Sequence, residues 1–203
     1  MKKTFISSLC TLAEFVREPR SKDLERSYAL RETINGKLDK VRALSDDALF
    51  EFERMREEDL AFRNRIRRWE TQLRIFFITK ITTWKYRAHL PGFELPESIA
   101  AGQVEFDDNL ARALDAMADH LEGRSIDKRF SFENGFALLE RAVQDARWHE
   151  PQECLSPPRF QTFLSLHQKL HTLITSLERD ISKHFPSFLA SQLTTSSSQH
   201  RRE

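Results

Sequence analysis

Turn-forming residues are scarce in this chain of 203 residues, which contains 5 Gly and 7 Pro. Average usage would give about twice as many, and a fold of short strands needs frequent turns. Charged residues make up 31% of the chain and hydrophobic residues 39%. This composition favours long helices and excludes collagen-like and wholly disordered chains. The length suits one domain or two small ones, and it can bury a core without disulfide or metal support.

Cysteines and long apolar runs are also few. Two cysteines, Cys10 and Cys154, do not make a disulfide framework, so we expect free thiols in a reducing compartment. The longest plainly apolar run covers residues 75–78, whereas a bilayer span needs about 20 such residues. The sequence therefore predicts a cytoplasmic chain without a membrane-spanning segment.

An excess of one charge is absent from the whole chain but present in its parts. The chain has 32 Lys and Arg and 31 Asp and Glu, a formal net charge of +1, which excludes a basic field over the whole protein. Residues 54–87 hold ten cationic and four acidic residues, net +6, and residues 91–123 hold one and eight, net −7. We predict a basic helix packed beside an acidic one, although each exposed ion pair contributes only about 0–1 kcal/mol.

Apolar residues recur at helical spacing through most of the chain, and no alternating strand pattern persists. The strongest stripe predicts a helix over residues 57–89, and the next predicts a helix over residues 96–122, with Gly123 as its C-terminal cap. The fold class is therefore expected to be all-α, an elongated antiparallel helical bundle with a long helical hairpin. We assign residues 1–20 to a short N-terminal helix, residues 21–186 to a single bundle domain and residues 187–203 to a disordered tail.

A short turn joins the two helices of the predicted hairpin. Pro91 closes the first helix, Gly92 can adopt a positive φ, and Pro96 starts the second helix. We predict a rigid connector with Phe93 and Leu95 tucked against the end of the hairpin; docking of this tip on a partner or a membrane is the alternative. A short connection makes the two helices antiparallel neighbours. In that hairpin Trp69, Leu73, Phe76 and Trp84 are buried against Phe106, Leu110, Leu114 and Met117.

Familiar catalytic and cofactor motifs are missing from the sequence, including the phosphate-binding loop, the dinucleotide fingerprint and the nucleophile elbow. His167 and His171 have the spacing of two metal ligands, but Gln168 stands where a metalloprotease has its base and no third ligand is evident. We interpret the two histidines as flank residues of a surface helix. The sequence thus predicts a non-enzymatic protein that needs no cofactor or metal.

Three arginines share one face of the basic helix: Arg63, Arg67 and Arg74. We expect them to face a protein partner or anionic lipid head groups, where each charge is worth about 1 kcal/mol. The same basic stretch is a weaker candidate for nucleic-acid binding, because Trp69 belongs to the apolar stripe and is better explained as core than as a platform for bases.

Several short segments together resemble a known family. They are Leu49–Phe52, Leu60–Arg63, Arg67–Glu70, Lys85–Arg87, Leu90–Pro96, Glu105–Asp108, Met117–Asp119 and Leu121–Gly123. These segments are similar to the soluble, cytoplasm-facing helical region of the fusaric-acid-resistance or aromatic-acid-exporter family of bacterial inner-membrane transporters. The resemblance covers about residues 21–180 and is sharpest over residues 45–123, where the Pro-Gly-Phe-Glu-Leu-Pro turn is its most specific element.

The resemblance implies a role in the export of aromatic or other hydrophobic acids, energised by a membrane bundle. Because the family carries transmembrane helices and this sequence predicts none, the chain cannot itself form a permeation path. The implied role is to couple, assemble or regulate the membrane part at the inner face of the inner membrane. The implied partners are a transporter component and an anionic membrane surface, with homo-oligomerisation left open. The alternative is a free-standing helical scaffold that binds another protein.

Overall fold

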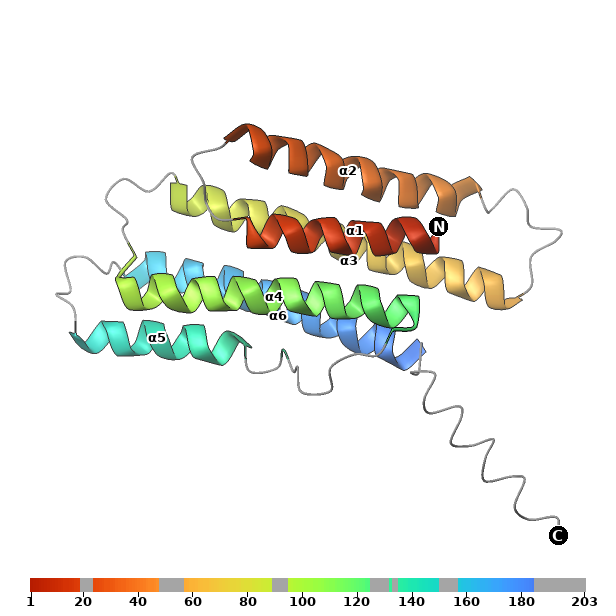
Figure 1. Ribbon diagram of the computed structural model, residues 1–203. Helices are drawn as coiled ribbons and strands as arrows, with labels where there is room; N and C mark the ends of the chain where they lie inside the picture. Colours follow the sequence, from red (N-terminus) through yellow and green to blue (C-terminus); the bar gives the residue numbers. More distant parts are fainter. Residues whose placement is uncertain are drawn as a thin grey trace, which may run out of the picture.

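A computed structural model describes residues 1–18, 24–47, 57–88, 95–124, 132, 135–149 and 157–184. These residues form helices α1 (Lys2–Arg17), α2 (Leu24–Asp47), α3 (Glu57–Ala88), α4 (Glu97–Glu122), α5 (Gly135–His149) and α6 (Pro157–His184). No strand occurs in the described ranges, so the all-α prediction is confirmed. The helices lie along one long axis and successive helices run in opposite directions, which gives an elongated antiparallel bundle (Figure 1).

Four of the helices form the centre of the bundle. α1 packs on α3 and α4, and α6 packs on the same two helices, so the four contacts close a ring. α2 lies along the edge formed by α1 and α3, and α5 lies along the opposite edge, formed by α4 and α6 (Figure 1). α3 and α4 stand diagonally across this ring, and within the described residues their backbones do not approach each other closely.

The prediction that the two helices of the hairpin are packed neighbours is therefore wrong. Most of the residues predicted to be buried in it are nevertheless buried. Trp69, Leu73 and Phe76 of α3 are buried, as are all four of the α4 residues expected to face them. The space between the two helices is filled by α1 instead. Its Phe5 ring lies 5.9 Å from the ring of Trp69. A short connection constrains the ends of two helices to be close, but a third helix can still enter between them.

Trp84 is the exception among the residues predicted to be buried. It is half-buried, and the guanidinium carbon of Arg31 lies 4.7 Å from the centre of its ring. Arg31 belongs to α2, so this end of α3 is covered by the outer helix and not by α4. A cation over an aromatic face contributes about 0.5–1 kcal/mol at an exposed site.

One ion pair does link the basic helix to the acidic helix as the charge pattern predicts. Lys80 Nζ of α3 lies 2.5 Å from Asp107 Oδ1 of α4, and both side chains are largely buried. Other cations of α3 pair with acids of α2 and α6, for example Arg67 with Asp46. The acidic residues of α4 are thus not the main partners of the basic helix.

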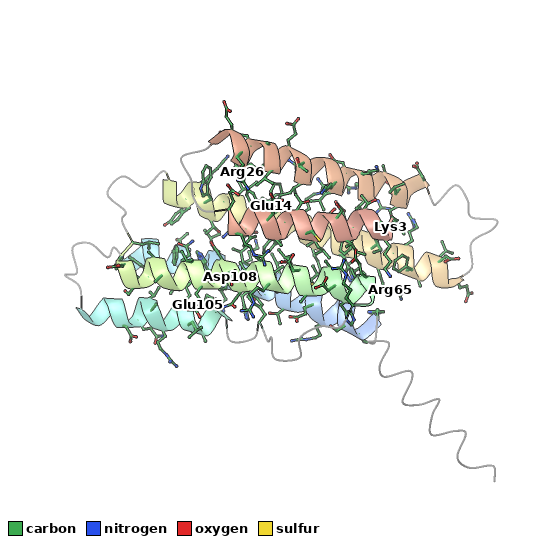
Figure 2. The ribbon with its side chains drawn as sticks, in the orientation of Figure 1. Lys3, Glu14, Arg26, Arg65, Glu105 and Asp108 are labelled. Atoms are coloured by element: carbon green, nitrogen blue, oxygen red, sulfur yellow. The ribbon has the colours of Figure 1, made fainter. Side chains whose placement is uncertain are left out.

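α1, the short N-terminal helix, is an integral part of the bundle and packs on α2, α3 and α4. It buries Phe5, Ile6, Ser8, Leu9, Thr11, Leu12, Ala13, Phe15 and Val16. Each fully buried large apolar side chain contributes about 1.5–3 kcal/mol. On its outer side Arg26 of α2 lies above α1 (Figure 2), with Nη2 3.8 Å from Glu14 and Nε 3.1 Å from Glu18.

The ends of α4 match the sequence prediction where the structure describes them. Gly123 has a φ of +80°, and its N–H donates to His120 O while the N–H of Arg124 donates to Asp119 O, the pattern that caps a helix with a glycine. Leu95 is half-buried and packs on the core, and Pro96 precedes the first turn. The rest of the predicted connector (Pro91, Gly92 and Phe93) and the tail over residues 187–203 lie outside the described residues.

Candidate binding cleft between α3 and α6

All three arginines predicted to face a partner or a membrane contact α2 instead. Arg63 is only 4% exposed, and its Nε donates to the carbonyl of Ser45 at 2.5 Å. Arg67 Nη1 lies 3.1 Å from Asp46 Oδ1. The expectation of an exposed Arg63 is therefore wrong, because the end of α2 covers this part of α3.

Arg74 also joins α3 to α2. Its guanidinium lies 2.7 Å from Glu70 Oε1 and 3.0 Å from Asp39 Oδ1. Desolvation by burial lowers the pKa of Arg74, but the hydrogen bonds to Glu70 and Asp39 outweigh it, and the net shift of the pKa is upward. The positive charge of Arg74 offsets the negative charge of the buried Glu70. The arginine face thus has a structural role in holding α2, with Arg67 and Arg74 still partly accessible.

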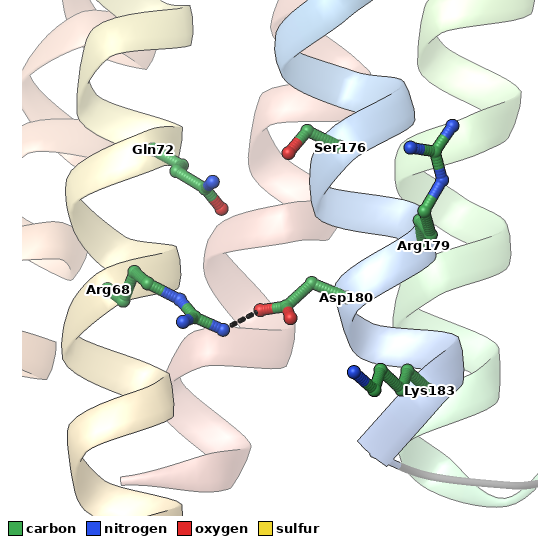
Figure 3. A pocket seen from close by; sticks show the side chains of 6 residues that line it. All are labelled: Arg68, Gln72, Ser176, Arg179, Asp180 and Lys183. Atoms are coloured by element: carbon green, nitrogen blue, oxygen red, sulfur yellow. Dashed lines mark hydrogen bonds and ion pairs between the residues drawn. The ribbon is translucent and has the colours of Figure 1, made fainter.

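A different group of cations lines an open cleft of about 370 Å³ between α3 and α6 (Figure 3). The residues that line it are Arg68 and Gln72 of α3 and Ser176, Arg179, Asp180 and Lys183 of α6. Residues four apart on a helix lie on the same face. This places the two α3 side chains one turn apart, opposite the last turns of α6.

Asp180 organises the floor of the cleft. Its carboxylate forms an ion pair with Arg68 and accepts a hydrogen bond from Trp69 Nε1 at 2.5 Å. Burial raises the pKa of Asp180, but the hydrogen bonds from Trp69 and Arg68 and the charge of Arg68 overcome that effect and lower the pKa below its usual value. Asp180 is therefore ionised at neutral pH, and its charge is used within the protein.

Arg179 and Lys183 have no ion-pair partner in the described part of the chain, and Figure 3 shows no contact of either with Asp180. With Arg68 they give the cleft three cations against one carboxylate, a formal charge of +2. The buried Oε1 atom of Gln72 also lacks a hydrogen-bond partner among the described residues. Guanidinium and ammonium groups around such an opening suit a carboxylate or a phosphate group.

Sequence reasoning missed this cleft because its cations lie far apart in the chain. The basic stretch over residues 54–87 indicated a cationic surface on α3 but none on α6. The available signal was Arg179 and Lys183, four residues apart on the last helix, but nothing in the sequence places them beside Arg68.

The two histidines with metal-ligand spacing are parts of the core. His167 is fully buried, with Nδ1 2.8 Å from Phe163 O and Nε2 3.3 Å from Gln103 Nε2. Its ring lies 5.4 Å from that of Phe106. The half-buried His171 packs against Phe132 and Phe136. The interpretation of both as flank residues of a surface helix is wrong, because α4 and α5 cover this side of α6.

Other groups that could carry chemistry give no second site among the residues that the structure describes. Cys10 is exposed, and its partial burial, then the charges of Asp115 and Asp119, raises the pKa of its thiol, which favours the less reactive protonated form. Cys154 lies outside the described residues. Within the described ranges no cluster of His, Cys, Asp and Glu side chains has the arrangement of a metal site.

No protein-family model, curated protein or solved structure matches this chain. None of the helices in the described part has the length and apolar character needed to cross a membrane.

Proposed function

We propose that this chain is a non-enzymatic helical binding domain that couples, assembles or regulates the membrane part of an aromatic-acid or fusaric-acid type exporter. The observation that carries the proposal is the cleft between α3 and α6, which presents Arg179 and Lys183 beside the Arg68–Asp180 pair. This arrangement suits an acidic segment of a partner protein. The resemblance of the short sequence segments supplies the class of partner, a component of a bacterial inner-membrane transporter.

The surface beside the cleft supports a protein partner over a small ligand. Ile75 and Ile78 are 41% and 57% exposed. Positions 68, 71, 75 and 78 follow one another at steps of three, four and three residues, so they lie on the same side of α3. Exposed aliphatic side chains beside cations are typical of a docking surface. We call the cleft residues together with Thr71, Ile75 and Ile78 the α3–α6 face.

The α3–α6 face also suits the second candidate function, a free-standing scaffold that binds another protein. Binding of nucleic acid is less well supported. The net +6 stretch loses much of its free charge to Asp46, Asp39, Glu70, Asp107 and Asp180. A nucleic-acid surface needs accessible cations that can displace counterions along the phosphate backbone.

Affinity capture from native membranes tests the proposal. The chain is compared with a cleft variant, Arg179→Glu with Lys183→Glu. The matched control is Lys40→Glu with Arg42→Glu, which makes the same change of charge at exposed positions of α2. We expect a transporter component to be recovered with the chain and the control and to be lost with the cleft variant. Equal recovery with all three proteins would contradict the proposal.

Two further measurements separate the alternatives. Flotation with vesicles of anionic lipid reports binding to the membrane surface, and salt-dependent retention on DNA or heparin reports binding to nucleic acid. The proposal predicts that the capture of the transporter component depends on the cleft even in detergent, where no lipid surface remains. Retention on DNA that is lost in the cleft variant, without capture of a transporter component, would favour the nucleic-acid function instead.

A further inference from the structure

A second exposed apolar patch lies on α4 and α5. Val104 of α4 is 69% exposed and Leu138 of α5 is 42% exposed. Gly102 lies against Leu139 and Ala142, and the rings of Phe106 and Phe136 are 6.4 Å apart. These contacts fix an antiparallel register in which Val104 and Leu138 stand at the same level of the two helices.

Acidic residues border this patch on α4, and the exposed Arg141 lies one turn from Leu138 on α5. Glu97, Ala101, Val104, Glu105 and Asp108 are exposed and fall on one face of α4, and Figure 2 shows Glu105 and Asp108 on that helix. Arg17 lies near these carboxylates, with its Nε 3.8 Å from Asp108 Oδ1, and the exposed Arg112 follows Asp108 by one turn on the same side of α4. We call Ala101, Val104 and Leu138, with Glu97, Glu105 and Asp108 at their rim, the α4–α5 face.

The two faces are complementary in chemistry and in layout. The α3–α6 face carries two exposed isoleucines and a cluster of cations, and the α4–α5 face carries exposed aliphatic residues and a cluster of acids. On α4 the acid Asp108 is one turn, about 6 Å, beyond Val104. On α3 the cleft residue Gln72 is likewise about one turn from Ile75. If Val104 of one copy contacts Ile75 of another, the carboxylate of Asp108 would therefore lie near Gln72, at the edge of the cleft.

We propose that the α3–α6 face of one copy of this chain binds the α4–α5 face of a second copy. The inference rests on the proposed function in that it uses the same cleft, so a second copy and the transporter component would compete for this docking site. Opposite charges at the rim orient such an interface, and the aliphatic residues at its centre lose contact with water.

The position of the faces determines the kind of assembly. α4 lies in front of α6 and α1 lies in front of α3 (Figure 1), so the two faces point to different sides of the bundle. Contacts between unlike faces continue head to tail, into a ring or an open chain. Two-fold pairing is disfavoured, because two α3–α6 faces would bring Arg179 and Lys183 of each copy together, and two α4–α5 faces would bring carboxylates together.

Charge reversal and mixing test the inference on the full chain. The cleft variant (Arg179→Glu, Lys183→Glu) reverses one face, and Glu97→Lys with Glu105→Lys reverses the other. Sedimentation velocity and light scattering over a wide range of protein concentration measure the mass. We expect the mass of the unmodified chain to rise above the 23.9 kDa monomer as concentration increases. Each variant alone should stay monomeric. The equimolar mixture of the two should regain assembly, since the intact cleft of one variant meets the intact α4–α5 face of the other and the two reversed faces are also complementary.

The α2 control (Lys40→Glu, Arg42→Glu) should assemble like the unmodified chain, and circular dichroism should show unchanged helicity and melting for all variants. A monomeric unmodified chain at all concentrations, unaffected assembly of either variant, or a mixture that stays monomeric would each overturn the inference. Failure here is distinguishable from failure of the proposed function. A monomeric chain that still captures a transporter component through the cleft loses only the self-assembly.

Discussion

The indole Nε1 of Trp69 donates a hydrogen bond to the carboxylate of Asp180, and the two atoms are 2.5 Å apart. The indole ring is fully buried in the core, beside Phe5 of α1, while Asp180 lines the open cleft. The same carboxylate holds Arg68 at the cleft rim. One side chain thus connects the central packing of the bundle to the proposed docking site.

Replacing Asp180 should weaken the fold at the α3–α6 contact. We expect Asp180→Asn to lower the free energy of unfolding by about 1–3 kcal/mol, because it removes a charged acceptor from Trp69 and Arg68. Asp39→Asn breaks a more exposed pair with Arg74 and should cost only about 0–1 kcal/mol. Urea unfolding measures both values. An equal, small effect of the two substitutions would show that Asp180 is not a structural acceptor.

The lowered pKa of Asp180 also predicts a dependence of stability on pH. A carboxyl group whose pKa is lower in the folded state than the ordinary 3.8 stabilises the protein at pH values above 3.8. That contribution is lost as the pH falls through the lowered folded value. Unfolding curves from pH 6 to about pH 2 should therefore converge for the unmodified chain and Asp180→Asn at the acid end. A constant difference over the whole range would contradict the lowered pKa.

The diagonal ion pair between Lys80 and Asp107 can be tested by a double-mutant cycle. Removing one partner leaves a largely buried charge uncompensated, so we expect Lys80→Met or Asp107→Leu alone to cost about 3 kcal/mol. The combined variant should cost less than the sum of the two, because no unpaired charge remains. Thermal and urea unfolding give the coupling energy. Additive effects would mean that the two side chains do not depend on each other.

Three glycines in different surroundings should respond differently to alanine. At Gly36, within α2, a Cβ atom would meet nothing within 4 Å, so Gly36→Ala should stabilise the protein by about 0.5–1 kcal/mol. At Gly102 the Cβ atom would lie 3.2 Å from Ala142 Cβ, and this crowding should reduce or reverse the gain. At Gly123, with φ of +80°, alanine should cost about 1 kcal/mol. Stabilisation at Gly102 equal to that at Gly36 would disprove the close approach of α4 and α5.

The sequence alone determined which residues are helical and, for the most part, which side of each helix is buried. The predicted helix over residues 57–89 corresponds to α3, Glu57–Ala88, and the predicted cap at Gly123 ends α4. These features depend on local physics. Apolar side chains three and four residues apart share a face, and glycine tolerates the backbone conformation that a helix end requires.

Only the tertiary structure decided which buried faces meet and which charges remain free. An apolar stripe pairs with any other of suitable shape, so the sequence could not show that α1 enters between α3 and α4. The paired states of Arg63 and Arg74 depend on α2, and the α3–α6 cleft depends on Arg68 and Asp180, which are 112 residues apart. Local periodicity indicates that a side chain is buried or exposed, but not its partner. Each charged side chain has many possible partners of opposite charge in the sequence. The packing of the helices determines which of these partners lies close enough to form an ion pair.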